Sequence, residues 1–129
     1  MQSILIVDDS VTARRIVRSA LEARGYAVCE ATDGEAALVA LEKAVPALVI
    51  SDVNMGPMDG LTLLSKIRLR FSPKQLPVLM LTTEAGDDLK ARGRAAGATG
   101  WLVKPFDAQR MGAVIAHVLA QQSENGQAR

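Results

Sequence analysis

Five short apolar runs alternate along the chain with five segments of helical periodicity, and this alternation restricts the fold more than any other feature of the sequence. Each run is rich in small and branched apolar residues and gives way to polar or turn-forming residues, as strands buried on both faces of a parallel sheet do. The runs occupy residues 3–7, 26–31, 47–52, 78–82 and 99–103. The pattern predicts an α/β domain in which five helices cover both faces of a doubly wound, five-stranded parallel sheet.

The segments between the runs carry apolar residues at the spacing of amphipathic helices. The first helix is expected to cover residues 11–24 and to stop at Gly25, which suits the turn after a helix. Thr32 or Asp33 can cap the second helix, whose apolar stripe would extend to Val45. The capping residues therefore support the boundaries that the apolar spacing suggests.

The three later helices follow the same rules. The third would direct its basic side chains toward water, namely Lys66, Arg68 and Arg70. Residues 85–96 form the weakest helical pattern, because two glycines lower their helix propensity. Asp107 can cap the last helix.

The composition suits one soluble domain of 129 residues, expected to span residues 1–122 and to be followed by a disordered polar tail at 123–129. A net charge of +1 and an aromatic content of 3% give no indication of nucleic-acid binding. No apolar run is long enough to span a membrane, so a cytoplasmic location is expected. The single cysteine, Cys29, excludes an internal disulfide framework and is interpreted as a small buried side chain.

Polar side chains end or directly follow four of the five apolar runs. They are Asp8 and Asp9, Asp52, Thr82, and Lys104. Because parallel strands end at one edge of the sheet, we expect these groups to lie together there. Three neighbouring carboxylates repel one another, and a divalent cation relieves that repulsion. Oxygen ligands in a shallow site favour Mg²⁺, or Mn²⁺ in its place.

The same groups suit a phosphoryl group. The cation and the Lys104 ammonium would neutralise its charge, and the Thr82 hydroxyl would donate a hydrogen bond to one of its oxygens. Asp52 can act as the nucleophile that accepts phosphoryl as a mixed anhydride. No histidine, cysteine or activated serine competes for that role at this edge.

The order and spacing of these strand-end residues, with Pro105 directly after Lys104, resemble the receiver domain of two-component response regulators. More narrowly, they resemble the single-domain chemotaxis regulators of the CheY type, and the resemblance covers residues 4–119. It implies a flavodoxin-like fold with strand order 2-1-3-4-5. It also implies that a histidine kinase or phosphotransfer protein phosphorylates Asp52.

The resemblance assigns further roles around Asp52. Asp9, Asp52 and the backbone carbonyl of Asn54 would bind Mg²⁺, with Asp8 supporting the site. Lys104 would pair with the phosphoryl group, and an X–Pro bond after it is one that can be cis. Asn54 and Glu84 occupy positions that set the lifetime of the phosphorylated state in the family.

The resemblance also implies a switch that acts on a downstream protein. Thr82 would move toward the phosphoryl group, and Trp101 would change rotamer with it. The family more often has Tyr or Phe at that position, so the bulkier Trp101 is a departure. The partner surface would be the fourth helix, the fifth strand and the fifth helix, including Lys90, Arg94 and Trp101.

Another departure lies in the loop after Asp52. The family commonly has Met-Pro after the asparagine, whereas here Met55-Gly56-Pro57 moves the proline by one position. Gly56 is conformationally freer and allows a different turn at this point.

Two other functions fit parts of the same pattern. A Mg²⁺-dependent phosphohydrolase with an aspartyl nucleophile would need a second carboxylate two residues later, and Asn54 occupies that position. A docking module that is never phosphorylated would keep the fold but would not need the complete set of polar residues.

Asp8 and Asp9 taken alone also suit a helix N-terminus. Both a monomer and a weak dimer fit the sequence.

Overall fold

A computed structural model describes residues 2–83, 86–105 and 107–127 and shows a five-stranded parallel sheet of order β2-β1-β3-β4-β5. This order confirms the predicted doubly wound α/β fold. The strands are β1 (Ser3–Val7), β2 (Ala27–Ala31), β3 (Leu48–Asp52), β4 (Val78–Thr82) and β5 (Gly100–Val103).

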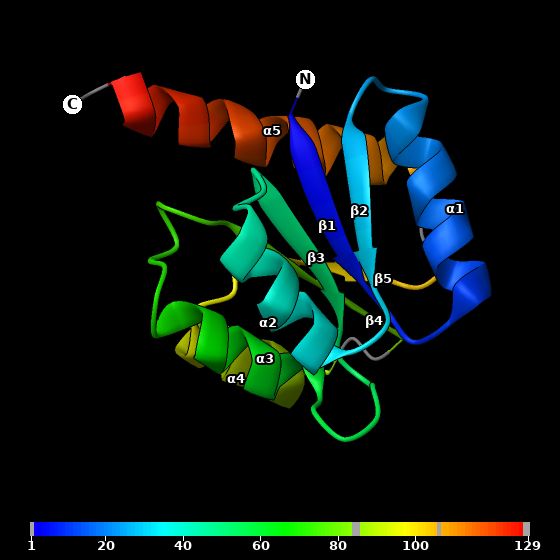
Figure 1. Cartoon of the computed structure of the whole chain (residues 1–129), viewed down its shortest axis with the longest axis vertical. Coiled ribbons are helices and arrows are strands. Elements are labelled where there is room, and N and C mark those ends of the chain that lie inside the picture. Colours follow the sequence, from blue (N-terminus) through cyan, green and yellow to red (C-terminus); the bar gives the residue numbers. More distant parts are fainter. Residues whose placement is uncertain (1, 84–85, 106, 128–129) are drawn as a thin grey trace.

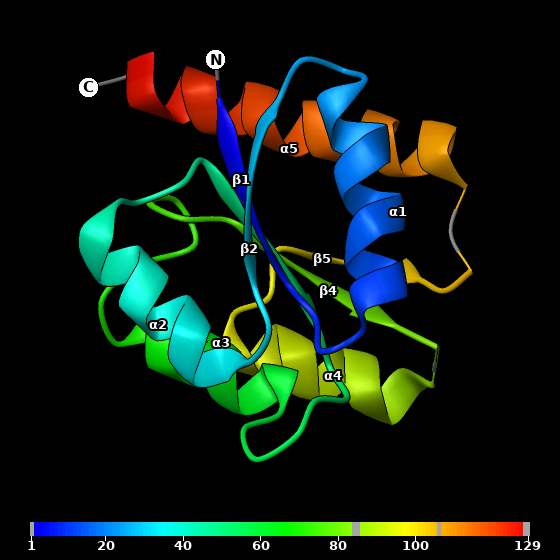
Figure 2. The ribbon, with the colours of Figure 1, turned by 45° about the vertical axis from the view of Figure 1, so that its right-hand side comes forward.

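Three helices cover one face of this sheet and two cover the other. The helices are α1 (Val11–Glu22), α2 (Gly34–Lys43), α3 (Gly60–Arg68), α4 (Asp87–Ala96) and α5 (Ala108–Gln127). The helices α2, α3 and α4 lie on one side of the sheet, and α1 and α5 lie on the other (Figures 1 and 2).

The strands supply both layers of the core because successive strand residues point to opposite faces. In β1, Leu5 and Val7 pack toward α2 and α3, whereas Ile4 and Ile6 pack toward α1 and α5. All five residues of β3 and all five of β4 are buried. The central strands therefore need apolar residues on both faces, which explains their continuous apolar runs.

Two helix ends differ from those expected. The first helix α1 ends at Glu22, and the chain turns over residues that end at Gly25, whose φ of 90° is the left-handed conformation that glycine tolerates. Asp33 caps α2 by accepting a hydrogen bond from the N–H of Ala36. Val45 lies beyond the end of α2 and is 53% exposed. The prediction that the apolar stripe of this helix extends to Val45 was therefore wrong.

Two single-residue expectations were also wrong. Cys29 is exposed, because β2 is an edge strand whose central residues are only partly covered. Arg68 does not point to water: its guanidinium donates to the carbonyl oxygens of Gly97 and Leu76 at 2.9 and 2.7 Å. Burial lowers the pKa of Arg68 below its ordinary value. The side chain thus ties the end of α3 to the turn after α4.

The last helix is longer than expected. It continues to Gln127, into the segment from residue 123 for which a disordered tail was expected. Among the described residues, no helix is both long enough and apolar enough to cross a membrane.

Candidate functional site

The register of the sheet brings the predicted polar residues to one edge. Val7 on β1 is paired with Ser51 on β3, so the residues that follow them, Asp8 and Asp52, emerge side by side. Thr82 is the last residue of β4, at the same end of the sheet. Its pairing partner on β5 is the residue before Lys104. The sheet therefore places one group from each of four strands around a common point.

Three carboxylates lie close enough to share a cation. Asp8, Asp9 and Asp52 each offer one oxygen, and these oxygens lie within 4.8 Å of one another. Asp8 and Asp52 are buried, whereas Asp9 is exposed. A hard divalent cation prefers such an oxygen-only set, and a site with one exposed side leaves room for its waters. The residues present therefore fit Mg²⁺ by their donor chemistry.

Lys104 joins the two buried carboxylates. Its Nζ lies 3.1 Å from Asp8 Oδ2 and 3.6 Å from Asp52 Oδ1. The backbone N–H of Lys104 donates to the carbonyl oxygen of Thr82 at 2.7 Å. This hydrogen bond holds the backbone from which the Lys104 side chain extends. The peptide bond between Lys104 and Pro105 is cis. One ammonium thus faces a site of three carboxylates, and the remaining negative charge favours a further cation.

The surroundings of Asp52 change the pKa of its carboxyl group. Burial raises the pKa of Asp52, and the negative charge of Asp8 raises it further. Lys104 and a backbone hydrogen bond with Asn54 act in the opposite direction without cancelling the rise. A bound cation would favour the charged form of Asp52, so proton and metal compete for the same group.

Gly60 packs closely against the backbone of Asp52, a contact that the sequence analysis did not predict. A Cβ at Gly60 would lie 2.1 Å from the carbonyl oxygen of Asp52 and 2.8 Å from the Cα of Val53. The N–H of Gly60 also donates to the carbonyl oxygen of Val53 at 2.8 Å. The start of α3 therefore packs directly on the backbone that carries Asp52. A glycine between an Asp cap and an apolar helix was the only signal in the sequence.

The loop between β3 and α3 does not use the left-handed backbone conformation that is open to Gly56. Gly56 is not in the left-handed region, because Gly25 and Gly97 are the only described glycines with a positive φ. Met58 packs over Gly34, at the start of α2. Asn54, at the start of the loop, is exposed beside the carboxylate cluster.

Trp101 lies on the α4 side of the sheet edge. Its indole is partly buried and rests on Gly93, where a Cβ would come within 2.1 Å of the indole Cζ2. Lys90 lines the same hollow as Trp101, whereas Arg94 is exposed and is not among the residues that line it. Thr82 is buried, and Glu84 lies outside the described residues. The small residue at 93 explains how the helix accommodates an indole.

The sequence matches the family model of the response regulator receiver domain over residues 4–116. The chemotaxis protein CheY-3 of Vibrio cholerae serotype O1 is 45% identical over 106 residues, 81% of this chain and 82% of that protein. The chemotaxis protein CheY of Pseudomonas aeruginosa is 43% identical over 107 residues, 82% of this chain and 86% of that protein. The solved structure of V. cholerae CheY4 has a TM-score of 0.87 at 42% identity, covering 92% of this chain and 98% of that one. The chain therefore belongs to the family of response regulator receiver domains.

Proposed function

We propose that this receiver domain is a cytoplasmic phosphoacceptor switch in chemotaxis-like signalling. It takes a phosphoryl group from a histidine kinase or phosphotransfer protein onto Asp52, and the modified domain then binds a downstream protein. One observation supports this most strongly: Asp52 is buried at the end of a central strand, with two further carboxylates and Lys104 around it. The chemotaxis proteins among its relatives support the signalling context.

The proposed reaction uses the groups of this edge in distinct roles. An oxygen of Asp52 forms a bond to phosphorus as the bond from phosphorus to the donor's imidazole nitrogen breaks, and the imidazole leaves. Asp9, Asp52 and the backbone carbonyl of Asn54 would hold Mg²⁺, with Asp8 as support. The ion supplies charge neutralisation for the phosphoryl oxygens. Lys104 turns its ammonium to another of these oxygens, and the Thr82 hydroxyl donates to a third.

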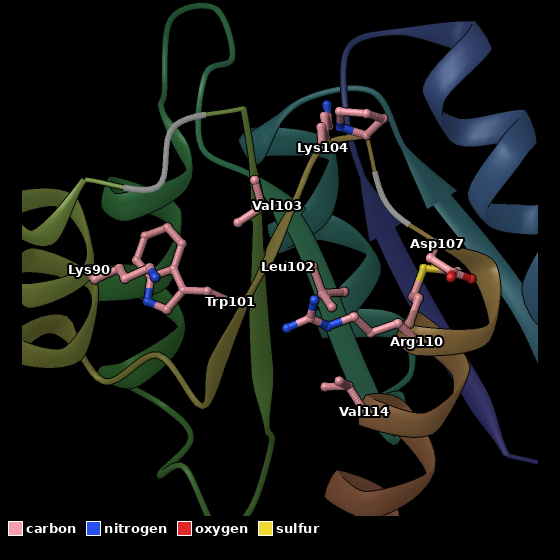
Figure 3. A pocket seen from close by; sticks show the side chains of 10 residues that line it. Lys90, Trp101, Leu102, Val103, Lys104, Asp107, Arg110 and Val114 are labelled. Carbon is pink, nitrogen blue, oxygen red and sulfur yellow. The ribbon is translucent and has the colours of Figure 1, made fainter.

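The proposed output surface surrounds a hollow between α4, β5 and α5. Figure 3 shows Trp101 directed toward α4 beside Lys90, and Arg110 reaching from α5 into the same region. Lys104 lines the upper end of this hollow in the view of Figure 3. Its Nζ lies 3.6 Å from Asp52 Oδ1, the proposed phosphorylation site. The hollow is lined by these three cations, one carboxylate from Asp107 and an aromatic side chain, so its net positive charge suits a partner segment with acidic and apolar residues. Phosphorylation would alter this surface through Thr82 and Trp101, which switch together.

Replacement of Gly93 by alanine is expected to move Trp101 without unfolding the domain. The new methyl group would overlap with the indole ring, which must move away from α4 and become more exposed. Helix α4 itself gains about 1 kcal/mol of helix propensity from the change. Trp101 is the only tryptophan, so a shift of its fluorescence emission to longer wavelength reports the movement. Gly86→Ala is the control, since no atom lies within 4 Å of its Cβ position. An unchanged emission spectrum in Gly93→Ala would contradict this arrangement.

Phosphorylation with a small donor tests the proposed function. Incubation with acetyl phosphate and Mg²⁺ is expected to add one phosphoryl group per chain, detected by intact mass, and a chelator should prevent it. Absence of both Mg²⁺ binding and phosphorylation would favour the docking module. Steady turnover of a phosphomonoester would favour the phosphohydrolase, whose general acid is missing at Asn54.

A further inference from the structure

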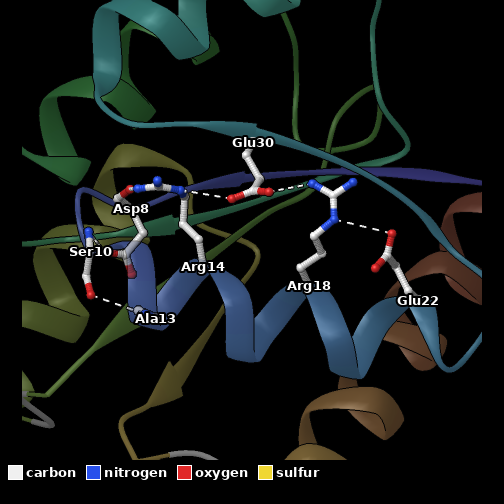
Figure 4. A network of polar contacts seen from close by, with 7 residues as sticks. All are labelled: Asp8, Ser10, Ala13, Arg14, Arg18, Glu22 and Glu30. Carbon is white, nitrogen blue, oxygen red and sulfur yellow. Dashed lines mark hydrogen bonds and ion pairs between the residues drawn. The ribbon is translucent and has the colours of Figure 1, made fainter.

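The guanidinium of Arg14, on α1, turns back over the end of β1 instead of extending into water. Its Nη1 donates to the backbone carbonyl oxygen of Asp8 at 2.7 Å, and its Nε donates to Glu30 Oε1 at 2.9 Å (Figure 4). The side chain is only 12% exposed. Arg14 therefore joins α1, the end of β1 and the edge strand β2 at a single point.

The carbonyl that Arg14 binds belongs to the peptide unit between Asp8 and Asp9. A peptide unit is planar, so a hydrogen bond to its oxygen also fixes the direction of the N–H of Asp9. The ladder between β1 and β2 ends with the pair of Val7 and Ala31. The N–H of Asp8 still reaches the carbonyl oxygen of Ala31 at 3.2 Å, but its own carbonyl lies beyond that ladder. Arg14 supplies the hydrogen bond that the sheet no longer provides.

The two carboxylates of this turn are held in different ways. Asp8 accepts hydrogen bonds from the N–H of Ser10 at 2.9 Å and from Lys104 at 3.1 Å. Asp9 is exposed, and no described residue forms a hydrogen bond or ion pair with its side chain. Its position near the other carboxylates therefore depends on the backbone that Arg14 holds.

Arg14 is itself held in place by a chain of ion pairs. Glu30 binds Arg14 through one oxygen and Arg18, one turn further along α1, through the other. Arg18 also pairs with Glu22 at 3.3 Å, as Figure 4 shows. The hydrogen bond from Arg18 keeps the pKa of Glu30 below its ordinary value, and the hydrogen bond from Arg14 lowers it by a smaller amount. The guanidinium of Arg14 is thus fixed from the side away from the carboxylates.

We propose that Arg14 is a positioning residue for the cation site: it orients the peptide between Asp8 and Asp9 so that Asp9 points at the ion. This inference rests on the Mg²⁺ site proposed above. Arg14 acts through the backbone and does not act as a ligand. Groups that orient metal ligands in this way commonly change metal affinity by about 10- to 100-fold when they are removed.

The direction of the effect separates positioning from simple charge. A positive guanidinium near a cation site repels the cation, so the loss of its charge alone would strengthen Mg²⁺ binding. Loss of positioning would weaken it instead. Arg15 is the matched control, because it is the next residue of α1, carries the same charge, and is exposed without a hydrogen bond or ion pair to any described residue.

The experiment measures the Kd of Mg²⁺ alone by calorimetry on the full chain, with no phosphodonor, and checks the fold by circular dichroism. Arg14→Met is expected to raise the Kd about 10-fold, whereas Arg15→Met should leave it unchanged or slightly lower. Arg14→Lys keeps the charge but cannot bridge a carbonyl and a carboxylate as a guanidinium does, so its Kd should lie in between. The core variant Ile115→Val should lose stability and keep the wild-type Kd.

A Kd for Arg14→Met that equals or falls below that of Arg15→Met would overturn the proposal. If Arg14→Met fails to fold, Arg14→Lys decides alone: a raised Kd supports positioning, and a wild-type Kd refutes it. A wild-type protein that binds no Mg²⁺ would refute the metal site itself, and with it this role of Arg14.

Discussion

The Asp52→Asn variant is expected to lose phosphorylation completely and yet to form a more stable metal-free fold at neutral pH. The loss follows because an amide has no carboxylate oxygen with which to form the mixed anhydride. The neighbouring carboxylates do not substitute for it, since Asp8 is engaged by Ser10 and Lys104 and Asp9 is exposed at the rim. Label that persisted on the variant after acetyl phosphate treatment would refute the assignment of Asp52.

The gain in stability follows from the raised pKa of Asp52. The folded state binds this proton more tightly than the unfolded state, in which the pKa is about 3.9. As the pH rises from that value through the folded-state pKa, the wild type therefore loses stability, because the folded protein must bury the charged carboxylate. Asparagine carries no charge and avoids this cost. Below both pKa values the difference between the two proteins should shrink.

Thermal unfolding in a chelator measures this effect, with a higher Tm expected for Asp52→Asn at neutral pH and a smaller difference in acid. Glu42→Gln, which removes the charge of an exposed carboxylate, is the control and should change the Tm little. Saturating Mg²⁺ should reverse the order, because a ligand at 100 times its Kd stabilises the wild type by about 2.7 kcal/mol. A lower Tm for Asp52→Asn in the chelator would show that its charge stabilises the fold.

The gathering of the polar residues of the proposed site could be predicted because parallel strands end at a common edge. Asp8, Asp52, Thr82 and Lys104 each follow or end an apolar run, so knowledge of the strands was enough to bring them together. The strand order itself came from the resemblance to a family, because the alternation of strands and helices does not specify it.

Single side chains between elements could not be predicted in this way. Arg68 has the sequence position of a solvated helix residue, but the carbonyls that it binds lie after α3 and α4. Arg14 likewise lies on a face rich in arginine, and only the fold shows that it reaches the turn after β1. Cys29 resembles a core residue until its strand is found at the edge. Each depends on how separate elements pack against one another, which the residue pattern within one element does not show.

The Gly60→Ala variant is expected to lose several kcal/mol of folding free energy, on the order of the largest overpacking effects. All three of the nearest atoms to the new methyl group belong to the backbone of Asp52 and Val53, at 2.1 to 2.9 Å. Backbone atoms cannot turn aside as a side chain can, and Asp52 ends a strand that is buried along its whole length. The φ of Gly60 is not positive, so the requirement is for space and not for an unusual conformation.

The same strain should reach the site, because the atoms that must move carry the phosphoacceptor. Molecules of Gly60→Ala that still fold are therefore expected to bind Mg²⁺ more weakly and to accept phosphoryl more slowly than the wild type. Gly56→Ala provides the matched control in the same loop, since no atom lies within 4 Å of its Cβ position and its φ is not positive. Its free energy of unfolding, measured with urea, should stay within about 0.5 kcal/mol of the wild type. Equal stability of the two variants would mean that α3 can withdraw from β3, and Gly60 would then have no part in holding Asp52.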